Sequence, residues 1–93
     1  MTIKNIEGEK KGQIIAEIEG KEAGVMEYTW AGSDKFIIDH TEVHAAFEGH
    51  GVGKKLVLEA VDYARNNDVK IMPLCPFAKS VFDRTEAFKD VLF

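Results

Sequence analysis

The stretch Phe47-Glu48-Gly49-His50-Gly51-Val52-Gly53-Lys54 decides the fold, because it places three alternating glycines directly before an amphipathic helix. Glycine is favoured where the backbone needs φ values closed to other residues, or where it must approach another group closely. A helix that begins in such a turn presents backbone N–H groups without internal partners, together with the positive end of the helix dipole. The stretch therefore predicts an anion site, most often one for phosphate.

The hydrophobic pattern on both sides of this turn predicts an α+β fold with a mixed sheet. Before the turn, period-two alternation indicates three strands joined by short turns, which form an antiparallel β-meander. After it, helical spacing indicates an amphipathic helix, followed by a short apolar strand and short C-terminal helices. A strand–helix–strand passage of this length implies a parallel, right-handed crossover. The expected elements are strands over 13–19, 22–30 and 35–45, a helix over 51–66, a strand over 69–75, and helices from residue 76 and over 85–93.

Two further features bear on the edges of the sheet. Pro73 has no N–H to donate, so its strand should be unpaired, bulged or splayed on one side. Residues 1–12 carry only Ile3 and Ile6 as apolar anchors, and residues 7–12 are typical of a solvated turn. We therefore expect the strand over 13–19 to be unpaired on one side. This free edge and the apolar C-terminal tail are surfaces through which the chain could form a homodimer.

Length and composition exclude several classes of protein. The chain has 93 residues, which suit one domain over 1–93. A formal net charge of −4 argues against nonspecific nucleic-acid binding, which needs clustered lysine and arginine. No stretch is long and apolar enough for a membrane span, and the first residues lack the apolar core of a signal peptide. A single cysteine cannot form an internal disulfide, which is typical of a cytoplasmic protein.

The glycine spacing does not fit two familiar nucleotide motifs. A Walker loop needs glycine where Glu48 stands and serine or threonine where Lys55 stands. A dinucleotide fingerprint has the spacing G-x-G-x-x-G, whereas the glycines here follow G-x-G-x-G. Neither a nucleoside triphosphate nor a dinucleotide is therefore expected.

The run from Glu48 to Leu56 resembles the acetyl-CoA pyrophosphate loop of the GCN5-related N-acetyltransferases (GNAT), in which Arg or Gln precedes two residues, Gly, any residue and Gly or Ala. Gly51 and Gly53 match this pattern, while Glu48 stands at the Arg or Gln position. The runs 40–43, 63–65 and 73–77 are similar to the small, single-domain branch of the superfamily, which lacks the usual acceptor-binding helices. The resemblance covers residues 13–88.

The resemblance implies a fold in which the strand before the turn and the parallel strand after the helix splay apart. The pantetheine arm of acetyl-CoA or CoA would lie in the resulting V. Because a carboxylate repels a pyrophosphate, Glu48 should weaken cofactor binding without abolishing it. The cofactor-binding residues expected on this basis are Val43, Ala45, Glu48, Gly49, His50, Gly51, Val52, Gly53, Lys54 and Phe82.

Three side chains are candidates for catalysis. Cys75 lies just before Pro76 and so near a helix N-terminus, where a thiol pKa tends to fall. It could accept the acetyl group, exchange disulfides with CoA, or be a small buried hydrophobe. His40 and Glu42 share a strand face, and either could take the proton of an ammonium acceptor, unless that face is only solvated. Together with His44 they would rarely converge on one ion, so no metal site is expected.

These observations predict an enzyme that transfers acetyl from acetyl-CoA to an unidentified amine, carried by a small molecule or a protein. Two alternatives remain open. The chain could be a noncatalytic CoA- or acyl-CoA-binding module or partner-dependent subunit. It could also be an interaction domain in which the glycine turn is only structural.

Overall fold

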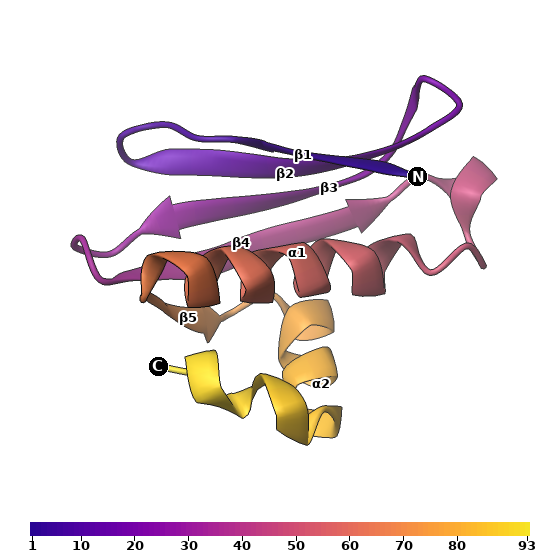
Figure 1. The fold of residues 1–93 in the computed structure, drawn as a ribbon. Coiled ribbons are helices and arrows are strands. Elements are labelled where there is room, and N and C mark those ends of the chain that lie inside the picture. The colour runs from indigo at the N-terminus through magenta and orange to yellow at the C-terminus, as the bar shows by residue number, and fades with distance from the viewer.

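The computed structural model describes residues 1–93 and contains one mixed sheet with helices packed against it (Figure 1). The strands lie in the order β1-β2-β3-β4-β5; the first four pair antiparallel, and β5 pairs parallel to β4. The α+β fold class is thus confirmed. The elements are β1 (Thr2–Ile6), β2 (Lys11–Ile18), β3 (Lys21–Trp30), β4 (Lys35–Val43), the 3₁₀ helix η1 (Ala45–Phe47), α1 (Val52–Asn67), β5 (Lys70–Pro73), α2 (Pro76–Arg84) and the 3₁₀ helix η2 (Glu86–Val91).

One hydrophobic core joins the sheet to its helices. Alternate strand residues such as Ile14, Met26 and Ile38 are fully buried, and they share a cluster with the apolar faces of α1 and α2. The residues between them along the strands are exposed or half-buried, because no helix covers the other side of the sheet. The sheet therefore has a covered face toward α1 and an open face on its other side.

The expectation that the strand over 13–19 is unpaired on one side is wrong, whereas the solvated turn expected over 7–12 is present in part, at the exposed residues 7–10. β1 pairs with β2 from Thr2 opposite Glu17 to Ile6 opposite Gln13, so the meander has four strands, and Lys11 and Gly12 belong to β2. The pattern missed β1 because its side chains are at most half-buried and its pairing rests on the backbone. Side chains also hold this edge: Tyr28 donates to Asn5 at 2.7 Å, and Tyr63 of α1 donates to Glu7 at 2.6 Å.

The strands β4 and β5 pair over only a short length and then part. Pairing runs from Lys35 opposite Lys70 to Ile38 opposite Pro73, and β5 ends there. The backbone N–H groups of Leu74 and Cys75 both donate to the carbonyl of Ile38, at 3.2 and 3.0 Å. The rest of β4 is left without a partner on that side, so the splay expected at Pro73 is present.

A β-bulge lies in β4 at the start of this unpaired part. Tyr28 is opposite Ile38 and Glu27 is opposite His40, which leaves Asp39 as an extra residue. The extra residue reverses the alternation of β4, so His40 lies on the open face although Ile38 lies in the core.

No helix of this chain has the length and apolar character that crossing a membrane would need.

Candidate functional site

The glycine turn enters α1 through left-handed backbone. Gly49 has φ of 84° and Gly51, the N-cap of α1, has φ of 72°, conformations that side chains with a Cβ adopt only at a cost. No acidic residue lies in the first turn of α1, and no side chain caps the helix. From Gly51 onward, the first backbone N–H that donates to a backbone carbonyl is that of Lys55, which bonds to the carbonyl of Gly51 at 3.1 Å. The N–H groups of Gly51, Val52, Gly53 and Lys54 are therefore free for an anion.

Space above the turn allows a ligand to reach these N–H groups. A Cβ placed on Gly49 or on Gly51 would meet no atom within 4 Å. A pocket of about 260 Å³ lies at this point and includes Lys54, the nearest cation of the turn. Its lining is Val43, Phe47, Glu48, Gly49, Gly51, Val52, Gly53, Lys54 and Phe77. Free N–H groups beside open space are the arrangement that binds a phosphate at a helix N-terminus.

The third glycine of the turn has a different role. A Cβ on Gly53 would lie 2.5 Å from the far end of the Phe77 ring, so the missing side chain lets α2 pack against α1. Phe77 is one of the four apolar side chains that line the pocket, with Val43, Phe47 and Val52. The sequence did not reveal Phe47 or Phe77 as pocket residues, because both read as ordinary apolar positions of their segments.

Three of the expected cofactor residues lie outside this pocket. Ala45 and His50 are exposed beside it, and the His50 ring packs edge-on against Phe47 with centroids 6.2 Å apart. Phe82 is fully buried in the core, where its ring packs against Phe88 at 6.0 Å. Of the expected cofactor-binding residues, Val43 and most of the glycine turn line the pocket, whereas Phe82 does not.

Cys75 lies at the point of the splay, as the N-cap of α2, and is 5% exposed. Burial by itself would raise the pKa of its thiol. The Thr41 side chain and the backbone N–H groups of Ala78, Phe77 and Thr41 outweigh that effect, so the pKa of Cys75 is lowered from its ordinary value. None of these contacts has the geometry of a full hydrogen bond, and the hydroxyl of Thr41 is buried without a partner. The sulfur and the free hydroxyl therefore face each other across the gap between β4 and α2.

His40 and Glu42 lie on the open face of the sheet rather than beside Cys75. Both side chains are 55% exposed, with His40 Nε2 3.4 Å from Glu42 Oε1. Glu42 also lies 3.6 Å from His44, which contacts Glu22 of β3 at 2.6 Å. The two candidate bases thus form part of one surface network, and no hydrogen bond or ion pair joins either to Cys75. No group of three or more histidine, cysteine or acidic side chains is arranged to hold a metal ion.

Comparison with known proteins gives a family match over most of the chain. The model of the family described as GCN5-related N-acetyl-transferase matches residues 13–91. Protein NATD1 of Xenopus tropicalis is 31% identical over 67 residues, which are 71% of this chain and 62% of that protein. The chain thus spans less than two thirds of that relative.

Solved structures share the fold. A GCN5-like protein of Staphylococcus aureus, solved by NMR, is 33% identical with a TM-score of 0.71, over 97% of this chain and 87% of its own. A GNAT family acetyltransferase of Elizabethkingia anophelis, solved with acetyl-CoA bound, has a TM-score of 0.62 at 17% identity. That match covers 69% of this chain and 42% of the other, and it shows that the two chains share a fold.

Proposed function

The chain belongs to the GCN5-related N-acetyltransferase family, and from that premise we propose that it binds acetyl-CoA and transfers the acetyl group to an amine. The observation that carries the proposal is the row of free N–H groups from Gly51 to Lys54 beneath open space. These groups would hold the pyrophosphate of the cofactor, with the dipole of α1 adding to the attraction. The bound cofactor would supply an acetyl group activated as a thioester.

The unpaired part of β4 is the proposed place for the pantetheine arm. Beyond Ile38 this strand has no neighbour on the β5 side, so its free backbone groups can bond to an amide-containing chain. The apolar side chains of Val43 and Phe77 line the way from the turn toward the splay. The buried hydroxyl of Thr41 also lacks a partner there. An unsatisfied buried polar atom costs about 1–3 kcal/mol, and a ligand in the splay could supply the missing bond.

The chemistry proposed for this chain's own residues consists of positioning and proton transfer. An amine acceptor is mostly protonated near neutral pH and must lose a proton before it can attack a carbonyl. We assign this proton to Glu42 or His40, which stand together on the open side of β4. An alternative route uses Cys75, whose surroundings favour the thiolate: its sulfur would attack the thioester carbonyl, CoA would leave as the thiolate, and the amine would then take the acetyl group from Cys75, which returns to the thiolate.

One observation favours a second candidate function, in which the chain binds CoA but transfers no acetyl group. The open face of the sheet, where an acceptor would bind, is not covered by any helix of the chain. Acetyl-CoA binding without turnover on any amine would identify the chain as a binding module.

The test compares Gly51→Ala with Gly20→Ala. Both glycines have left-handed backbone, with φ of 72° and 78°, and a Cβ on either meets open space. Both variants should therefore lose similar stability, roughly 1–2 kcal/mol. Only Gly51→Ala puts a methyl group into the anion site, so calorimetry should find acetyl-CoA affinity lowered at least about tenfold, or ~1.4 kcal/mol. Equal affinities of Gly51→Ala and Gly20→Ala would refute the site.

A further inference from the structure

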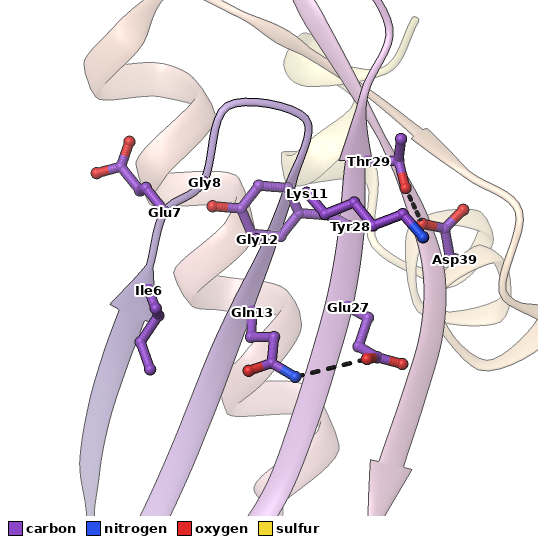
Figure 2. Close-up of a pocket in the computed structure, with 10 residues that line it drawn as sticks. All are labelled: Ile6, Glu7, Gly8, Lys11, Gly12, Gln13, Glu27, Tyr28, Thr29 and Asp39. Carbon is purple, nitrogen blue, oxygen red and sulfur yellow. Dashed lines mark hydrogen bonds between the residues drawn. The ribbon is translucent and has the colours of Figure 1, made fainter.

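The largest cavity of the molecule shares no residue with the pocket at the glycine turn. It lies on the open face of the sheet, beside the turn between β1 and β2, and has a volume of about 510 Å³ (Figure 2). Its carboxylates Glu27 and Asp39 already accept hydrogen bonds, from Gln13 at 3.5 Å and from Thr29. Nothing links this cavity to the proposed cofactor.

A second hollow continues directly from the pocket at the turn. It has a volume of about 320 Å³, within the range of small-molecule sites, and it lies between α1 on one side and α2 and η2 on the other. Lys54 lines both hollows, so a ligand can pass from one to the other along this side chain. We call the second hollow the α1–α2 groove, and its lining is Lys54, Lys55, Leu58, Val81, Thr85 and Phe88.

Helical spacing explains why these side chains share one groove. Lys54 and Lys55 lie four and three residues before Leu58, which puts all three on one face of α1. On α2, Phe77 of the pocket at the turn and Val81 of the groove are four residues apart and share a face as well. The two hollows therefore follow the same pair of helices away from the turn.

The groove is basic, although the chain has a formal net charge of −4. Its lining holds the ammonium groups of Lys54 and Lys55 and no carboxylate, which is true of no other hollow in the molecule. Neither lysine belongs to any of the surface ion pairs of the chain. Two unpaired ammonium groups next to each other favour a phosphate as the ligand.

The rest of the groove is mainly apolar. Leu58 is 37% exposed, so its side chain has room for an apolar partner. The ring of Phe88 is half-buried and packs against Phe82 at 6.0 Å, which fixes its position at the edge of the groove. An open leucine beside an aromatic ring suits a flat aromatic group such as a nucleobase.

We propose that the α1–α2 groove binds the nucleotide end of CoA, which carries an adenine base and a phosphate on the 3′ oxygen of its ribose. With the pyrophosphate on the N–H groups of the turn, adenine packs on Leu58 and Phe88, and the 3′-phosphate accepts hydrogen bonds from Lys54 and Lys55. Leu58 lies about 6 Å along α1 from Lys54, a step that ribose and base can span.

This inference rests on the proposed function and adds two consequences to it. The 3′-phosphate becomes the group by which the chain selects CoA over dephospho-CoA. The two lysines also offset the repulsion between Glu48 and the pyrophosphate, because they attract the same ligand from the adjoining groove.

An NMR titration of isotope-labelled protein tests where the nucleotide end lies. CoA should cause saturable shifts of the amides of Leu58, Val81 and Thr85 in addition to those of the turn. 4′-Phosphopantetheine carries the arm and one phosphate but no nucleoside. It should therefore shift amides of the turn and leave those three amides unchanged.

Affinities measured by calorimetry test the 3′-phosphate. Dephospho-CoA lacks only this group, so the unmodified protein should bind CoA at least about fivefold more tightly. Lys55→Gln should lower the affinity for CoA by about threefold and leave that for dephospho-CoA unchanged. Lys10→Gln removes the same charge from an exposed lysine in the turn between β1 and β2, and serves as the matched control with both affinities unchanged.

A second variant, Leu58→Gln, tests the contact with adenine. Both CoA and dephospho-CoA contain adenine, so this variant should weaken the binding of both by a similar factor, at least about threefold. Binding of 4′-phosphopantetheine should stay the same.

Three results would overturn the inference: equal affinities of the unmodified protein for CoA and dephospho-CoA, equal effects of Lys55→Gln and Lys10→Gln, or no shifts at the groove with CoA. Any of these, together with saturable shifts at Gly49 to Lys54, would overturn the role of the groove alone. Absence of CoA binding would overturn the proposed function, and with it the role of the groove.

Discussion

Individual residues of the glycine turn serve different ends, although they look alike in the sequence. Glycine is needed at positions 49 and 51 because the backbone there is left-handed, and open space lies next to both residues. Glycine is needed at position 53 because a Cβ there would meet the ring of Phe77. The need for glycine could be predicted from the motif. The partner of Gly53 could not, because the contact depends on how α2 packs. Glu48 is exposed at the pocket, so weakened cofactor binding remains a prediction.

The same limit applies to Cys75. Its place before Pro76 was enough to predict a lowered pKa, and the pKa is lowered. The sequence did not reveal that Thr41 contributes to this lowered pKa, because its hydroxyl comes near the sulfur of Cys75 only where β4 and β5 splay apart. The role of the thiol in transfer is still a proposal.

A pH titration of the Cys75 thiolate absorbance tests this environment. Its midpoint should lie below that of the same thiol in the unfolded chain, because the nearby donors lower the pKa of Cys75 by favouring the thiolate over the thiol. Thr41→Val removes the largest of the contributions that lower the pKa, so its midpoint should move upward. The urea-unfolded chain supplies the reference midpoint. A midpoint at or above that reference, or no effect of Thr41→Val, would contradict the assignment.

At the scale of elements, the alternating strands and the amphipathic helix could be predicted within a few residues, whereas β1 and the bulge could not. β1 carries too few buried side chains to leave a periodic pattern. The bulge at Asp39 is one unpaired residue, visible only once the register with β3 is known. Without it, strict alternation would place His40 and Glu42 on the same face as Ile38, in the core. The bulge is the reason that these two residues share the open face instead.

The packing of Tyr28 of β3 against β2 depends on Gly12, a residue that the sequence pattern assigned to a solvated turn. A Cβ on Gly12 would lie 2.3 Å from the ring of Tyr28, which is 1% exposed and bonded to Asn5. Gly12→Ala should therefore lower the free energy of unfolding by about 1–3 kcal/mol, measured by urea denaturation. Gln13→Ala, an exposed neighbour on the same strand, should change it by no more than about 0.5 kcal/mol. Equal midpoints for the two variants would contradict the packing described for Tyr28.

For the molecule as a whole, the pyrophosphate site and the cavity beside the turn between β1 and β2 differ in how far the sequence could predict them. The pyrophosphate site lies within one continuous stretch, so a motif was sufficient to find most of it. The cavity on the open face draws its lining from four strands, and each of its charged residues taken alone looks like part of a solvated face. Only the strand register brings Glu27 and Asp39 together.

The central claim is that the N-terminus of α1 holds the pyrophosphate of CoA. It is tested most directly by an NMR titration of the unmodified protein with CoA. We predict saturable shifts that are largest for the amides of Gly49 to Lys54, with smaller shifts at Thr41 and Cys75 along the splay. Absence of saturable shifts at millimolar CoA, or largest shifts away from the turn, would contradict the claim.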